Sequence, residues 1–175
     1  MTQSGREMTT LKFKNKIILF LFVHTNKKHL SLSSMKTSES RYSDCIYFVS
    51  NALARKVDKL ASDAWKKVNL APSHAYLLMI VIDKPGSQPG MLSEELHLTP
   101  STVTRLIEKL EDKKLVTRLT QGKTTNVFPT QKGKDLVPKL RACVQEFNTA
   151  YLEILGKEES EKLVRNMNKI ADKLQ

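Results

Sequence analysis

The chain has 175 residues, of which 40% are hydrophobic and 27% charged, values typical of a globular protein that exclude general disorder. Its formal net charge of +11 indicates a polyanionic partner, most often a nucleic acid or a membrane surface. The cysteines and histidines are scattered without metal-ligand or CxxC spacing, so we expect no disulfide framework, no metal site and a reduced, cytoplasmic protein. Because the sequence contains no phosphate loop, GxSxG or HExxH motif, we expect neither an enzyme nor a cofactor.

Residues 1–35 differ in composition from the rest of the chain. The basic stretch LKFKNK precedes a short apolar run, residues 17–23, at the lower limit for the core of a signal peptide and too short to span a bilayer. Two interpretations of this N-terminal extension stay open. Either Met35 is the physiological start, or the extension is an accessory arm that adds basic charge or dimer contacts.

The next segments are expected to be helical. Apolar residues recur in steps of four and three over residues 38–68 and predict one long amphipathic helix. Pro72 starts a second helix over residues 72–82, which is almost wholly apolar and should form the buried centre of its domain. Residues 83–90 read as a loop with a short strand near 87–89.

A compact run of elements follows. Residues 91–97 form a short helix, and Thr99 and Pro100 are suited to the N-cap and first position of the next one. Residues 115–119 and 124–128 predict two strands of a hairpin with its tip at 120–123. Thr130 should then cap one long helix to about residue 155, Gly156 should end it, and residues 157–174 should form the last helix.

The helix after Thr99 has two faces of different chemistry. Its apolar residues recur at helical spacing and should point inward: Val103, Leu106, Ile107 and Leu110. The other face carries short hydroxyls and an arginine, which can reach phosphates and pair with guanine. A helix-turn-helix followed by a hairpin is a winged helix-turn-helix, in which a helix fills the major groove and the hairpin reaches the neighbouring groove or backbone. The predicted DNA-binding residues are Ser101, Thr102, Thr104, Arg105, Lys109, Arg118, Lys123 and Thr124.

The same segment resembles the MarR family of multiple-antibiotic-resistance regulators. The similarity lies in LHLTPSTVTRLI (residues 96–107), LEDKKLVTR (110–118) and PTQKG (129–133). It implies a mainly α fold with a small β-hairpin wing and long terminal helices that intertwine in a homodimer. It also implies binding to palindromic operator DNA as a repressor, relieved by a small-molecule effector. One difference is that Gln121-Gly122-Lys123 stands where family wings carry an Asp-Arg-Arg element, which shifts expected specificity toward residues 101–105.

The resemblance divides the chain into four parts. These are an N-terminal extension (1–35), an N-terminal dimerisation helix (36–68), the winged helix-turn-helix (69–130) and C-terminal dimerisation helices (131–175). Trp65, His74 and Tyr76 are candidate effector-binding residues, because family members take ligands where the dimer region meets the DNA-binding lobe. Packing in the core is the alternative role for all three.

Two other functions remain open from the sequence. A winged helix can serve as a protein-interaction module without binding DNA. Cys45 lies near the position of the reactive cysteine in peroxide-sensing relatives, which leaves a peroxide sensor or thiol enzyme as the other alternative, although the residue is displaced by about two positions.

Overall fold

The computed structural model describes residues 35–174 of the chain. The two interpretations of the N-terminal extension concern residues outside this part and stay predictions. The chain divides into two compact units, the first ending at Lys56 and the second beginning at Val57. Within residues 35–174, no helix combines the length and the apolar character needed to cross a membrane.

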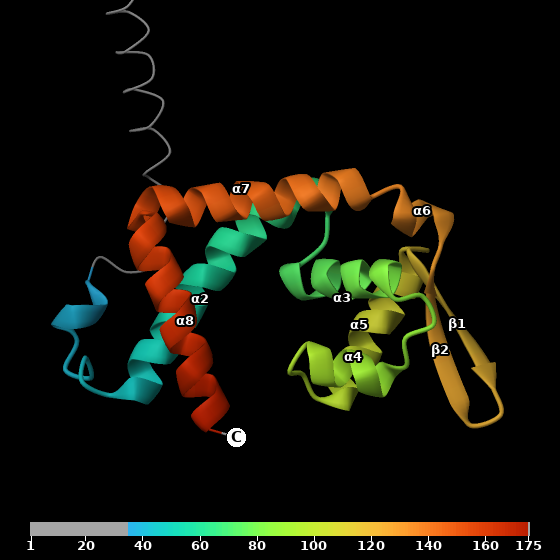
Figure 1. Ribbon diagram of the computed structural model, residues 1–175, viewed down its shortest axis with the longest axis horizontal. Helices are drawn as coiled ribbons and strands as arrows, with labels where there is room; N and C mark the ends of the chain where they lie inside the picture. The colour runs from blue at the N-terminus through green and yellow to red at the C-terminus, as the bar shows by residue number, and fades with distance from the viewer. Residues whose placement is uncertain (1–34, 175) are drawn as a thin grey trace, which may run out of the picture. The chain divides into compact units, whose positions relative to one another are not determined.

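The described residues are mostly helical, with one antiparallel hairpin (Figure 1). In chain order the elements are η2 (Thr37–Glu39), α2 (Ile46–Trp65), η3 (Lys66–Val68), α3 (Pro72–Asp83), α4 (Pro89–Glu95), α5 (Pro100–Asp112), β1 (Val116–Gln121), β2 (Thr124–Pro129), α6 (Gln131–Lys134), α7 (Val137–Leu155) and α8 (Lys157–Lys173). This architecture confirms the predicted fold class, a mainly α protein with a β-hairpin wing.

The prediction of one long helix over residues 38–68 is wrong at both ends, because α2 is shorter. The chain forms the 3-10 turn η2 and further turns before α2 begins at Ile46. The reason is local competition for backbone donors, since the Glu39 carboxylate accepts the N–H of Lys36 and the Ser40 hydroxyl accepts the N–H of Tyr42. At the other end α2 gives way to η3, and Asn69 takes the left-handed conformation at φ 53°.

The core of the second unit is built around α3, as predicted. Its buried residues come from α3 itself, from the inner face of α5, from both hairpin strands and from α7: Ala75, Leu77, Leu78, Val81, Val103, Leu106, Ile107, Leu110, Val116, Val127, Leu140 and Cys143. The helix is not buried on all sides, because Tyr76 remains 39% exposed. Burial of this apolar set is the main force that fixes α5 and the hairpin beside α3.

The hairpin lies against α3, α4 and α5 (Figure 1). Its register runs from Val116 opposite Pro129 to Gln121 opposite Thr124, and Gly122 turns the chain at φ 62°. The tip is therefore shorter than the predicted residues 120–123. The predicted strand near residue 87 is present as one bridge between Ser87 and Val127, in which the Val127 N–H donates to the Ser87 carbonyl at 3.0 Å.

The single helix predicted from Thr130 to residue 155 is also wrong. Thr130 does cap a helix, but that helix is the short α6, and α7 begins separately at Val137. Pro138 lacks the N–H that would bond the Lys134 carbonyl, and the Leu136 N–H turns instead to the Gly133 carbonyl. Gly156 at φ 78° ends α7 as predicted, and α8 follows at once.

Candidate DNA-binding site

The N-terminus of α5 is held by its cap and by the turn before it. The Thr99 hydroxyl accepts the N–H of Thr102 at 3.3 Å, and Pro100 occupies the first turn, as predicted. In the preceding turn the Leu98 N–H donates to the Ser93 carbonyl, and the Ser93 hydroxyl donates back to the Leu98 carbonyl. These bonds fix the turn between α4 and α5, so the N-terminus of α5 is held in a defined position relative to α4.

The two faces of α5 separate as the sequence predicts. All four inward residues are buried, whereas Ser101, Thr104, Arg105 and Lys109 are exposed on the opposite face. Two of the hydroxyls already have local partners. Thr104 donates to the Pro100 carbonyl at 2.9 Å, and Thr102, which is half-buried, lies 2.8 Å from the Thr99 hydroxyl.

Arg105 is the exposed residue of α5 best suited to base recognition. It forms no ion pair with any residue of the described part of the chain. Its guanidinium therefore keeps its planar set of donors for an external acceptor, such as the O6 and N7 atoms of guanine.

Arg118 has a protein partner that the sequence analysis did not foresee. Its guanidinium Nη2 lies 2.6 Å from Oε2 of Glu111, and its backbone N–H donates to Oε1 of the same carboxylate at 2.9 Å. Glu111 thus ties the end of α5 to the start of β1. The predicted phosphate contact of Arg118 would have to compete with this pair.

The hairpin tip carries the remaining predicted contacts. Lys123 and Thr124 are exposed, and Thr124 opposite Gln121 closes the strand ladder. Within residues 116–129, Lys123 is the only cation without an ion-pair partner. The structure therefore gives α5 and the hairpin tip separate cationic groups, Arg105 and Lys123.

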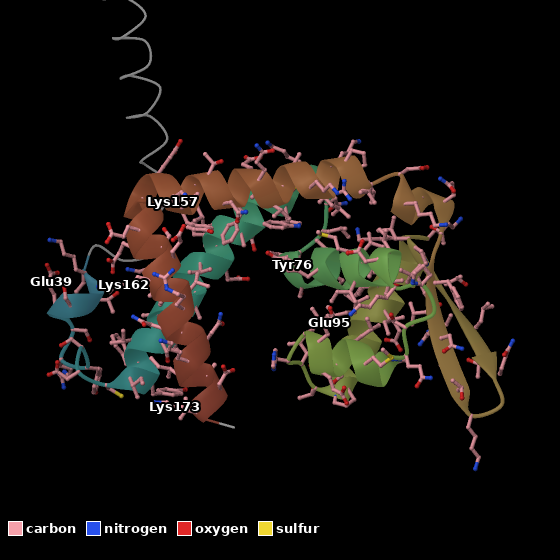
Figure 2. All side chains as sticks on the ribbon, in the orientation of Figure 1. Glu39, Tyr76, Glu95, Lys157, Lys162 and Lys173 are labelled. Carbon is pink, nitrogen blue, oxygen red and sulfur yellow. The ribbon has the colours of Figure 1, made fainter. Side chains whose placement is uncertain are left out.

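Trp65 is the centre of an aromatic cluster in the second unit. It is fully buried, with ring centroids 5.5 Å from Tyr76 of α3 and 5.8 Å from Phe147 of α7, and Phe147 lies 5.3 Å from Tyr151 (Figure 2 labels Tyr76). The indole Nε1 is buried without a hydrogen-bond partner. Burial is the main cause that raises the pKa of Tyr76, and the nearby Tyr151 raises this pKa further. Phe147 and Tyr151 are not among the residues predicted from the sequence, although their i, i+4 aromatic spacing on a predicted helix is a readable signal.

His74 belongs to a different environment from Trp65 and Tyr76. It lies two residues from Tyr76 on α3, and positions two apart on a helix do not face the same way. Burial lowers the pKa of His74, and Lys113 and Lys109 lower it further. The residue is therefore a half-buried histidine beside the end of α5, and the three effector candidates do not form one cluster.

A small cavity lies between α3 and α7, away from the aromatic cluster. Its volume is about 90 Å³, and its lining includes Met79, Asp83, Leu140 and Arg141. Ligand pockets usually measure roughly 300–1,000 Å³, so this cavity is too small for a drug-sized effector. Among residues 35–174, no group of three or more His, Cys, Asp or Glu side chains is placed to hold a metal ion.

Comparison with known proteins shows which family this part of the chain resembles. Residues 68–123 match the model of the MarR family. A curated relative, the uncharacterized HTH-type transcriptional regulator YybA of Bacillus subtilis (strain 168), is 26% identical over 121 residues, which cover 67% of this chain and 81% of the relative.

Solved structures share the fold. A MarR-family regulator from Rhodococcus sp. RHA1 is 21% identical, with a TM-score of 0.65 over 75% of this chain and 96% of its own. MepR of S. aureus, solved as a DNA complex, is also 21% identical, with a TM-score of 0.65 over 74% of this chain and 98% of its own. CouR from Rhodococcus jostii RHA1, solved with p-coumaroyl-CoA, is 20% identical, with a TM-score of 0.62 over 77% and 95%. The resemblance predicted from the sequence is confirmed over residues 68–123, which match the MarR family model, and the solved structures share the winged helix-turn-helix fold of this chain.

Proposed function

We propose that this protein is a transcriptional regulator that binds near-palindromic duplex DNA as a homodimer and releases it on binding a small molecule. The observation that carries the proposal is α5, a capped helix with four buried residues on one side and Ser101, Thr104 and Arg105 exposed on the other. In this assignment α5 enters the major groove and Arg105 reads a guanine. Repression is the expected outcome of such binding when the operator overlaps a promoter.

The predicted contacts divide by role. Ser101, Thr102, Thr104 and Arg105 lie in the front half of α5, from which base edges are read, and Lys109, Lys123 and Thr124 bind phosphates. Relatives of the same fold support the assignment, since MepR was solved as a DNA complex. Arg118 is a weaker candidate than the sequence indicated, because its charge is already balanced by Glu111.

Homodimerisation is supported by apolar side chains that the single chain leaves in water. On α8 these are Val164, Met167 and Ile170, with Leu174 following the helix, and on α7 they are Ile154 and Leu155. The first unit separately exposes Tyr42, Ile46 and Tyr47. Surfaces of this kind are typical of subunit interfaces. In such a dimer the two recognition helices would lie about 34–36 Å apart, one turn of the double helix.

The effector site is proposed at the aromatic cluster around Trp65. An unpartnered indole N–H in an apolar environment is costly, and a ligand with a hydrogen-bond acceptor would satisfy it. The effector should therefore combine an apolar or aromatic body with an acceptor. Trp65 is the only tryptophan of the chain, so its fluorescence reports on this site. Release of DNA by a compound that leaves this fluorescence unchanged would place the effector site elsewhere.

Selection of bound sequences from a random DNA pool tests the central claim. The expected product is a palindrome with half-sites one helical turn apart. On that operator, Arg105→Ala should cost about 1–3 kcal/mol and relax the preference at one position of each half-site. Lys123→Ala is the matched control, because it should weaken all sequences alike and reduce the salt dependence by about one counterion. Equal losses on operator and random DNA for Arg105→Ala would exclude base reading by this residue.

The oligomeric state tests the second claim. Ile170→Glu should shift the protein toward monomer in sedimentation experiments, because it places a charge on the exposed apolar face of α8. Lys169→Glu is the control, with a change at the neighbouring position. A wild-type protein that sediments as a monomer at micromolar concentration would contradict the dimer.

A further inference from the structure

The recognition helix ends in an unusual way. The Lys114 N–H donates to the Glu111 carbonyl at 2.7 Å and the Leu115 N–H to the Leu110 carbonyl at 2.9 Å, the bonding pattern of a Schellman motif. Lys114 occupies the left-handed position of this motif at φ 59°, where glycine is favoured. The carbonyls of Lys113, at the C-cap, and of Lys114 and Leu115, just beyond the helix, have no acceptor role inside α5 and take their donors from elsewhere.

Those donors come from the segment between β2 and α6. The Thr130 hydroxyl donates to the Lys114 carbonyl at 2.8 Å, and the Thr130 N–H donates to the Leu115 carbonyl at 3.0 Å. Nζ of Lys132 donates to the Lys113 carbonyl at 2.9 Å. The side chains of Thr130 and Lys132 are called the carbonyl clamp below.

Close packing locks the carbonyl clamp in place. The Thr130 hydroxyl also accepts the Gly133 N–H at 3.1 Å, which makes it the cap of α6. A Cβ at Gly133 would lie 2.3 Å from the Leu115 carbonyl oxygen, so only glycine allows α6 to approach this closely. The clamp therefore joins the end of α5 to the end of the hairpin through a contact with little room to adjust.

We infer that Thr130 and Lys132 are positioning residues for DNA recognition, and this inference rests on the proposed function. The front of α5 is fixed by Thr99 and the turn before it, and its rear end is tied to the wing by the Glu111–Arg118 pair and by the carbonyl clamp. With both ends held, the helix and the hairpin keep one relative orientation. Thr130 and Lys132 thus set the sequence preference of DNA binding without touching DNA.

A phosphate contact by Lys132 is the competing explanation, and salt dependence separates the two. A lysine that neutralises a phosphate adds about one counterion to the salt slope and acts on every sequence alike. A lysine that holds a carbonyl changes operator affinity but leaves the slope unchanged. Lys134 on the same short helix is exposed, and its ammonium group forms no hydrogen bond or ion pair within residues 35–174, so Lys134→Met controls for the loss of a nearby charge.

The experiment measures binding to the selected operator and to random DNA over a range of salt concentrations. Thr130→Val and Lys132→Met should each weaken operator binding about five- to tenfold, the effect of losing one hydrogen bond at the helix end. Binding to random DNA should change by less than about twofold, and Thr130→Ser should restore operator binding because it retains the hydroxyl. Amide hydrogen exchange at Lys113, Lys114 and Leu115 should accelerate in both clamp variants without DNA present.

Three results would overturn the inference. They are full operator preference in Thr130→Val, equal loss on both DNAs in Lys132→Met, and a salt slope reduced by about one in Lys132→Met but not in Lys134→Met. If Thr130→Val does not fold, Lys132→Met decides alone, because it leaves the α6 cap intact. A wild-type protein that selects no DNA sequence would refute the proposed function. If the wild type does select an operator, the three results above refute only the role assigned to Thr130 and Lys132.

Discussion

Lys114→Gly should stabilise the protein, because it relieves the strain at the end of α5. An L-residue in the left-handed region costs about 1–2 kcal/mol relative to glycine. Glycine in turn loses about 0.4–1 kcal/mol through the greater freedom of the unfolded chain. Lys114 is exposed, and its ammonium group forms no hydrogen bond or ion pair within residues 35–174, so the net gain should be about 0.5–1 kcal/mol.

The neighbouring residue provides the matched control. Lys113 ends the same helix in a right-handed conformation at φ −79°, where glycine brings no relief. Lys113→Gly removes the same charge and should destabilise the protein by about 0.5–1 kcal/mol. Urea unfolding at fixed protein concentration and salt measures both changes. Equal destabilisation by the two variants would show that the left-handed conformation of Lys114 carries no strain.

Three further changes follow from the described contacts. Gly133→Ala should destabilise the fold by about 1–3 kcal/mol in urea unfolding, because the alanine Cβ would collide with the Leu115 carbonyl. This loss should exceed the gain from alanine's better helix propensity, and unchanged stability would show that α6 can move away from Leu115. Burial lowers the pKa of folded His74, so its contribution to stability is complete above the unfolded value of 6.5 and is lost as the pH falls below it. His74→Gln should therefore flatten the decline of the urea midpoint between pH 7 and 5.5, and a parallel decline would exclude His74 as its source. Glu111→Gln should lower the free energy of unfolding by less than about 1 kcal/mol. It should also tighten binding to random DNA, because it frees the Arg118 guanidinium from its ion pair. Unchanged binding would show that this guanidinium does not reach DNA.

The winged helix-turn-helix could be predicted because its signals are local. Thr99 and Pro100 mark the start of α5 by cap chemistry, and the alternation of apolar and polar residues at helical spacing assigns its faces. The hairpin follows from β-branched residues on either side of Gly122. Each of these patterns lies within a few residues, where backbone preferences decide the structure.

The features that could not be predicted depend on partners distant in sequence or on tolerated strain. Glu111 meets Arg118 only because α5 turns sharply into β1, and Trp65 meets Phe147 across the core. Lys114 takes the left-handed conformation at φ 59° without being glycine or asparagine, so no residue type in the sequence marks this helix end. Pro138 fits the first turn of α7, so its presence in the predicted helix does not by itself mark the break that lies before Val137.

The bridge between Ser87 and Val127 makes the base and the tip of the wing differ in how many backbone partners hold them. At its base β2 is paired on both edges, with β1 on one side and Ser87 on the other, and the Gly86 N–H also donates to the Val127 carbonyl at 2.8 Å. Residues 120–125 extend past this support and are held only by the two-stranded ladder. The base of the wing is therefore more firmly held than its tip. Lys123 at the tip can adjust to grooves of different width while the base stays in place.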